Sequence, residues 1–158
     1  MPSCTRRFTF AAGHRVLGHI QDGMPGKCAS LHGHGYVAEV TCYAGTLNDL
    51  EMVVDFGVVK KLVGTWIEEN WDHRMILWKE DPLYILWEEL GPELGGKLIG
   101  ERGICSSMRN PTAEALSEWL CHEANKLLAD ADLSVRCSHV RIYETENCWS
   151  DFCWFIGD

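Results

Sequence analysis

The sequence has 158 residues, which is enough for one domain with a hydrophobic core and too few for two typical domains. Hydrophobic residues make up 46% of the chain, which argues against disorder, and the net charge of −9 without long Lys or Arg runs argues against general nucleic-acid binding. No apolar stretch approaches the roughly 18 to 20 residues that span a bilayer, and the N-terminus lacks the apolar core of a signal peptide, so we expect a cytoplasmic protein with no membrane partner.

The first expected elements are β-strands. "CTRRFTFAA" (4–12) alternates polar and apolar residues, and "GYVAEVTCYAG" (35–45) continues with β-branched and aromatic residues. Turn residues in "AGTLNDLE" (44–51) then lead into "EMVVDFG" (51–57), which predicts the second arm of an antiparallel hairpin.

Helices follow in the middle of the chain. Asp55 is a plausible N-cap, and the apolar residues after it recur at the spacing of one helix face. A second helix is predicted in "NPTAEALSEWLCHEANKLLADA" (110–131), while glycines and prolines in 77–109 indicate an irregular insertion with a possible short helix. Two strands, 134–145 and 148–156, complete an α+β fold in which the helices cover one face of an antiparallel sheet.

The segment "CASLHGHG" (28–35) indicates a metal site. In an extended chain, His32 and His34 project from the same face, and His14 joins them if the first strand pairs with the strand after His34. Three imidazoles suit Zn²⁺ and leave a fourth position open, although iron or nickel accepts the same ligands. Cys28 is compatible with a fourth ligand, with a reactive thiolate that removes a proton, or with an ordinary buried thiol. The eight cysteines form no C-x-x-C pair, so we expect free thiols.

A second set of polar residues follows the helices and strands. Asp72 beside His73 suits an acid–base pair whose imidazole is oriented by the carboxylate, although an exposed helix end is the simpler explanation of the dipeptide alone. Glu144 ends a predicted strand and is either solvated or able to accept two hydrogen bonds from a planar ring edge. Thr112 and Glu114 most simply cap the second helix.

Six fragments together resemble the family of 6-pyruvoyl-tetrahydropterin and 6-carboxytetrahydropterin synthases. They are "FTFAAGH", "CASLHGHGY", "VVDFGVVK", "WDH", "NPTAEALSEWL" and "VRIYETE", in the family's order and across nearly the whole chain. The spacing of Cys28 and His32 makes the sequence most similar to the carboxytetrahydropterin synthases of the queuosine pathway. The resemblance implies a single tunnelling-fold (T-fold) domain over 1–158, a four-stranded antiparallel sheet with two helices in the order ββααββ, and assembly into a trimer or hexamer.

The resemblance also implies residue roles. The zinc ligands carry over to His14, His32 and His34, and the catalytic residues to Cys28, Asp72 and His73; the pterin ring would be bound by Glu144, with Thr112 in support. The implied substrate is 7,8-dihydroneopterin triphosphate, converted to 6-carboxy-5,6,7,8-tetrahydropterin with loss of acetaldehyde and triphosphate. An acidic chain needs local cations for a triphosphate, and the candidates are Lys27, Arg15 and Arg74.

The departures from the family pattern lie outside these residues. They are Gly13, Trp71 and the long 77–109 insertion. Three alternatives stay open: formation of 6-pyruvoyl-tetrahydropterin, aldol cleavage of dihydroneopterin, and a non-catalytic module in which Cys28 closes a Cys-His₃ zinc site.

Overall fold

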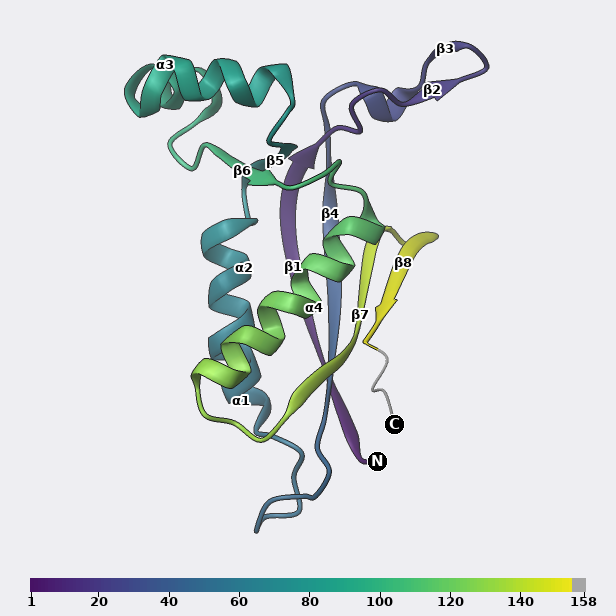
Figure 1. The fold of residues 1–158 in the computed structure, drawn as a ribbon, viewed down its shortest axis with the longest axis vertical. Helices are drawn as coiled ribbons and strands as arrows, with labels where there is room; N and C mark the ends of the chain where they lie inside the picture. Colours follow the sequence, from purple (N-terminus) through teal and green to yellow (C-terminus); the bar gives the residue numbers. More distant parts are fainter. Residues whose placement is uncertain (155–158) are drawn as a thin grey trace.

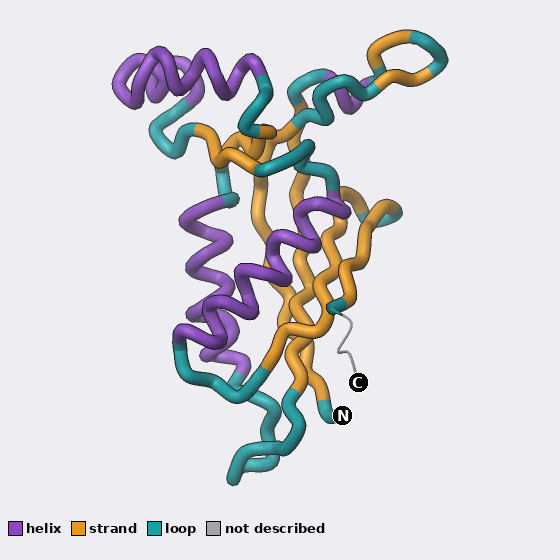
Figure 2. The backbone as a smooth tube through the Cα atoms, viewed as in Figure 1, coloured by secondary structure: helices purple, strands orange, loops and turns teal. Residues whose placement is uncertain are grey.

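A curled six-stranded sheet with helices on one face forms the body of the protein (Figures 1 and 2). The structure is a computed structural model that describes residues 1–154. The strand order is β6-β5-β1-β4-β7-β8. Its four antiparallel members are β1 (Ser3–His14), β4 (His32–Tyr43), β7 (Arg136–Thr145) and β8 (Cys148–Cys153). The expected α+β T-fold is confirmed, with two additional strands at one edge. The final residues of the strand predicted over 148–156 lie outside the described residues.

The longest pairing joins β1 to β4, in register from Ser3 opposite Tyr43 to His14 opposite His32. Their alternating residues are buried on the helix side of the sheet, as period-2 patterning requires. The connection between them holds a small hairpin, β2 (Ile20–Gln21) and β3 (Met24–Pro25). The predicted strand over 51–57 is wrong. β1 and β7 already occupy both edges of β4. The segment instead completes a loop that leads into the helix beginning at Phe56, and in this loop the Asn48 side chain accepts from the Leu50 and Met52 amides at 2.9 and 3.0 Å.

The first helical segment is continuous from residue 56 to residue 70. It comprises α1 (Phe56–Val59), a π-helical turn (Lys60–Gly64) and α2 (Thr65–Asn70). Asp55 is the expected N-cap and accepts from the Gly57 amide at 2.5 Å. Gly64 lies against Phe8 of β1, where an added Cβ would come within 3.1 Å of the ring. This close approach seats the helix on the sheet.

The second predicted helix is α4 (Ala113–Asp130), which packs on β7 and β8. Thr112 is its N-cap, with the side-chain oxygen 3.3 Å from the Ala115 amide. Leu116, Leu120 and Leu128 are fully buried along one side of the helix. Each such leucine contributes roughly 1.5 to 3 kcal/mol relative to an exposed position, so this face fixes α4 on the sheet. No helix within residues 1–154 combines the length and hydropathy of a bilayer-spanning segment.

The insertion is regular, and the expectation of an irregular segment is therefore corrected. It contains α3 (Pro82–Ile99), which lies between β5 (Arg74–Trp78) and β6 (Ile104–Ser107). β5 pairs in parallel with the end of β1, and β6 pairs in parallel with β5. α3 is kinked where Gly91 has φ +71° before Pro92. It projects at the end of the sheet where β1 ends and β4 begins (Figure 1).

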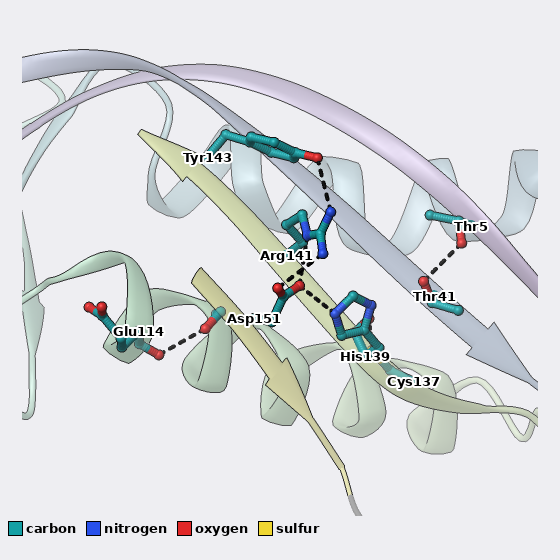
Figure 3. A network of polar contacts seen from close by, with 9 residues as sticks. Thr5, Thr41, Glu114, Cys137, His139, Arg141, Tyr143 and Asp151 are labelled. Carbon is teal, nitrogen blue, oxygen red and sulfur yellow. Dashed lines mark hydrogen bonds and ion pairs between the residues drawn. The ribbon is translucent and has the colours of Figure 1, made fainter. Parts of the chain in front are cut away.

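The sheet face opposite the helices is polar. Arg7, Glu39, Arg141 and Asp151 follow one another across four neighbouring strands in register. Figure 3 shows the Asp151 carboxylate between Arg141, whose Nε lies at 2.7 Å, and His139, whose Nε2 lies at 2.6 Å. An antiparallel sheet can leave one polar face to water when helices cover the other face.

Candidate active site

Three histidines meet at the end of the long β1–β4 pair. His14 ends β1 directly opposite His32, and His34 follows on the same face of β4. One ligand nitrogen from each lies within 4.8 Å of the others, and the ring centroids are 4.5 to 5.1 Å apart. The predicted convergence of His14, His32 and His34 is therefore present.

Backbone carbonyls orient two of these rings. His14 Nδ1 lies 2.7 Å from Pro111 O, and His32 Nδ1 lies 2.7 Å from Ser30 O. A carbonyl can only accept, so each Nδ1 carries the proton and each Nε2 presents its lone pair to the cluster. His14 Nε2 and His34 Nε2 are buried without a hydrogen-bond partner among the described residues. Unpaired buried nitrogens that face one another are what a metal ion would satisfy.

The electrostatics of the cluster favour neutral rings. Burial, and then the neighbouring His32 and His34, lower the pKa of His14 to about 4, and the bond to Pro111 opposes this only in part. Burial first, then His32, also lowers the pKa of His34, against the opposing attraction of Glu144. Neutral imidazole is the form that binds a metal ion. The residues present therefore fit a divalent ion held by three nitrogens.

A cavity of about 300 Å³ adjoins the cluster and contains most of the other predicted residues. His14, Cys28, Thr112 and Glu144 all line it. Glu144 Oε1 lies 3.8 Å from His14 Nε2. Cys28 is exposed and is not a member of the compact ligand group, which consists of the three histidines among residues 1–154. The arrangement places a thiol and a carboxylate in the cavity next to the three histidines, and Glu114 lines the same cavity.

Asp72 and His73 form a clamped turn after α2. Asp72 Oδ1 accepts from the Ala11 amide at 2.9 Å, Oδ2 lies 2.8 Å from His73 Nδ1, and the His73 amide donates to Ala11 O at 2.6 Å. Burial would raise the pKa of Asp72, but the bonds from Ala11 and His73 and the nearby charge of Arg102 hold it below its usual range. His73 therefore has a protonated Nδ1 and a free Nε2. It lines a separate cavity of about 430 Å³, together with His34.

Two residues at the site were not predicted. Tyr36 is buried beside His14 and His34, with ring centroids 5.8 and 5.3 Å away, and its hydroxyl has no partner among the described residues. Burial first, and then Glu144, raise the pKa of Tyr36, so it stays protonated. The His32, His34, Tyr36 alternation was the available signal. His19 lines the Cys28 cavity with a buried, unpartnered Nδ1, and no spacing in the sequence pointed to it.

Comparison with known proteins places this site in a family. The sequence model of the family described as "6-pyruvoyl tetrahydropterin synthase" matches residues 3–153. The chain belongs to this family. It is 39% identical over 150 residues to the 6-carboxy-5,6,7,8-tetrahydropterin synthase of Rickettsia typhi, covering 94% of this chain and 98% of the relative. The Aquifex aeolicus protein of the same name is 32% identical over 160 residues, covering 94% of this chain and 95% of the relative.

Solved structures share the family fold. An uncharacterized protein from Wolinella succinogenes superposes with a TM-score of 0.78 at 23% identity, over 96% of this chain and 97% of that chain. The 6-pyruvoyl tetrahydropterin synthase of Caenorhabditis elegans gives a TM-score of 0.63 at 21% identity, over 98% of both chains. At these identities the likeness establishes the fold and leaves the reaction to the site residues and the sequence relatives.

Proposed function

We propose that this synthase-family member is a zinc-dependent 6-carboxy-5,6,7,8-tetrahydropterin synthase. Its substrate would be 7,8-dihydroneopterin triphosphate, and its products 6-carboxytetrahydropterin, acetaldehyde and triphosphate. The observation that carries the proposal is the set of three oriented imidazoles next to a cavity that holds both Cys28 and Glu144. The Rickettsia and Aquifex relatives that bear this name align with the chain over almost their full length.

Zn²⁺ is the proposed ion, held by His14, His32 and His34. Three neutral nitrogen ligands with Cys28 outside the ligand group suit an ion that keeps one position open. When bound, it would supply Lewis-acid stabilisation of negative charge that develops on the substrate side chain. Carbonyl bonds to His14 and His32 would hold the ligand rings in the binding tautomer before the ion arrives.

Glu144 is proposed to bind the pterin ring. An ionised carboxylate has two acceptor oxygens, which match the adjacent N–H and NH₂ groups on one edge of a pterin. Glu144 lies on the wall of the cavity that adjoins His14, and Thr112 and Glu114 lie on the same wall. A ring held there would place its side chain toward the histidines, which is the positioning that the reaction needs.

Cys28 and His73 are the proposed proton carriers, with Asp72 as the orienting carboxylate. Cys28 is exposed to the cavity, as a thiol that exchanges a proton must be. His73 Nδ1 keeps its proton and donates it in a hydrogen bond to Asp72, so Nε2 is free to accept or deliver a proton. The His73 side chain is 71% exposed in the single chain, so a neighbouring subunit would be needed to shield it from water.

We further propose a closed homo-oligomer, a trimer or a stacked hexamer. β8 is an edge strand of the sheet. β1 pairs with β5 at Ala12–His14, so within residues 1–154 most of the edge of β1 that faces away from β4 is unpaired. Joining β8 of one copy to β1 of the next would pair both edges and remove an aggregation-prone feature. The polar face of Figure 3 would then line a central channel.

We also propose a cytoplasmic location. All eight cysteines lie within the described residues and are free thiols, as expected for a reducing compartment.

Product analysis tests the reaction. Purified protein is incubated with 7,8-dihydroneopterin triphosphate, and pterins and acetaldehyde are identified by mass spectrometry. A 6-pyruvoyl product without acetaldehyde would refute the carboxy synthase and favour the pyruvoyl alternative, whereas cleavage of dihydroneopterin itself would favour an aldolase.

Cys28→Ala tests whether the thiol is catalytic or a metal ligand, with Cys153→Ala, an exposed thiol on β8, as the control. We expect Cys28→Ala to keep its zinc and lose turnover, and Cys153→Ala to keep both. Loss of zinc from Cys28→Ala would instead support a closed Cys-His₃ module.

A further inference from the structure

Two arginines, Arg74 and Arg102, meet beside His73. Arg102 belongs to the 77–109 insertion, to which the proposed reaction assigns no role. Arg74 follows His73 directly and begins β5. Arg102 lies in the turn between α3 and β6, and the backbone oxygen of this residue accepts a hydrogen bond from Arg74 Nη1. The guanidinium of Arg102 returns to the His73 turn, where its Nη1 donates to Asp72 O at 2.8 Å.

The two guanidinium groups are held by neutral carbonyls. Arg74 Nε donates to Glu69 O at 2.9 Å, and Arg102 Nη1 donates to Glu68 O at 2.6 Å. Neither arginine is paired with a carboxylate in any ion pair of residues 1–154. The Asp72 carboxylate in the same turn already accepts from the Ala11 amide and pairs with His73. Both guanidinium groups are thus fixed in place without an ion-pair partner within residues 1–154, although the charge of Arg102 also acts on the nearby Asp72 carboxylate.

Donor groups remain available on both side chains. A guanidinium has five N–H donors, and the described contacts use only Nε and Nη1 of Arg74 and only Nη1 of Arg102. Arg74 also lines the 430 Å³ cavity that contains His73 and His34. Planar guanidinium forks match phosphate oxygens in both geometry and charge.

The turn that contains Arg102 is held by a backbone hydrogen bond and by packing against α3. Gly100 and Gly103 both have positive φ values, of +108° and +66°, and the Gly103 amide donates to Gly100 O at 3.0 Å. Trp87 of α3 packs on this turn so closely that a Cβ at Gly103 would come within 2.8 Å of its ring. The insertion therefore places Arg102 on a turn that is packed against α3.

The other expected cations are less suited to an anion. Arg15 is bound to the buried Asp81 through Nε at 2.7 Å and Nη2 at 2.5 Å, which neutralises its charge. Lys27 is exposed and precedes Cys28, but it is a single flexible charge. In a chain with a net charge of −9, Arg74 and Arg102 place two fixed guanidinium groups beside His73, whereas Lys27 beside Cys28 is a single charge.

We propose that Arg74 and Arg102 form a polyphosphate-binding subsite that holds the triphosphate of the substrate beside His73. This inference rests on the proposed function for the identity of the substrate, but the chemistry of the subsite requires only a polyphosphate anion. It assigns a role to the insertion: the insertion delivers the second arginine.

The test uses inorganic triphosphate as the probe, titrated calorimetrically into the full-length zinc-loaded protein. We expect binding that weakens by at least about tenfold in Arg102→Gln, since hydrogen bonds to charged groups are the stronger ones. Arg102→Lys should retain part of the affinity because it keeps the charge. Arg136→Gln, which removes an exposed arginine at the start of β7, is the matched control and should bind as the wild type does.

Two further measurements, circular dichroism and turnover, distinguish a failure of the subsite from misfolding of a variant and from a failure of the proposed reaction. Circular dichroism establishes that Arg102→Gln is folded, and Arg74→Gln provides a second variant if it is not. Unchanged triphosphate affinity in both folded Gln variants would overturn the subsite. If the variants lose triphosphate binding but the wild type forms no carboxytetrahydropterin, the subsite stands and the proposed reaction fails. If turnover occurs and its KM is the same in the variants, the reaction stands and the subsite is refuted.

Discussion

The Asp72→Asn substitution separates the orienting carboxylate from the rest of the site. Asp72 accepts from the Ala11 amide through Oδ1 and from His73 Nδ1 through Oδ2. Asparagine can keep the first bond with its carbonyl oxygen. Its NH₂ group then faces His73 Nδ1 and requires that nitrogen to accept, so the imidazole proton moves to Nε2. The His73 side chain would then present a proton on Nε2, where the proposed mechanism needs a lone pair.

The expected loss follows from the size of this catalytic contribution. General acid–base catalysis typically supplies about 10²- to 10⁴-fold of rate acceleration. We therefore expect kcat to fall by a factor in that range, which corresponds to an activation free energy about 2.7 to 5.5 kcal/mol higher. Folding should change little, since the clamp to β1 survives. The assay is acetaldehyde and pterin formation under saturating substrate, with zinc measured by elemental analysis.

The control is Asp132→Asn, which removes a carboxylate at an exposed turn where φ is +54°, a conformation that asparagine tolerates. We expect wild-type turnover from it. A kcat for Asp72→Asn within twofold of the wild type, at full zinc content, would refute the orienting role of Asp72.

Three further predictions test the metal, the pterin site and the attachment of α3. His32→Ala should abolish zinc binding, and a full equivalent of zinc by elemental analysis would contradict the ligand assignment. Glu144→Gln should raise KM by at least about tenfold with zinc unchanged, because a charge-assisted bidentate contact is lost; an unchanged KM would remove Glu144 from the pterin site. Asp81→Ala should lower unfolding free energy by about 3 to 5 kcal/mol, since it breaks a buried pair with Arg15 and the N-cap of α3. Chemical denaturation would measure this, and a loss below about 1 kcal/mol would contradict it.

The same buried carboxylate predicts a pH dependence. Burial opposes ionisation of Asp81, but the bonds from Arg15 and the Leu83 amide outweigh it and lower its pKa. The folded protein therefore binds fewer protons than the unfolded chain in the acid range. Its stability from this group is complete above the unfolded pKa of about 3.9 and decreases as the pH falls below it. Denaturation of Asp81→Asn should lack this component, and an identical pH profile in the variant and wild type would exclude it.

The metal ligands and the main elements could be read from local patterns. His32 and His34 share a face because strand residues alternate, and a strand ending in His14 needs only a neighbouring strand to join them. The helices over 56–70 and 113–130 follow from their caps and apolar spacing, and Asp55 and Thr112 do cap them. For the shared face of His32 and His34 and for the helix caps, the determining interactions lie within a few residues of one another, whereas the meeting of His14 with His32 also needs the pairing of β1 with β4.

Other features depended on pairings that only the folded chain reveals. The segment 51–57 follows turn residues as the second arm of a hairpin would, but both edges of β4 are taken by β1 and β7. β5 and β6 pair in parallel across an intervening helix, and such pairs have no short turn to mark them in the sequence. Arg15 and Arg74 are equal cations in the sequence, yet Asp81 neutralises one and Arg102 joins the other. Strand alternation and helix caps are short-range and therefore visible in the sequence, whereas edge occupancy and charge pairing are long-range and are set by the tertiary structure.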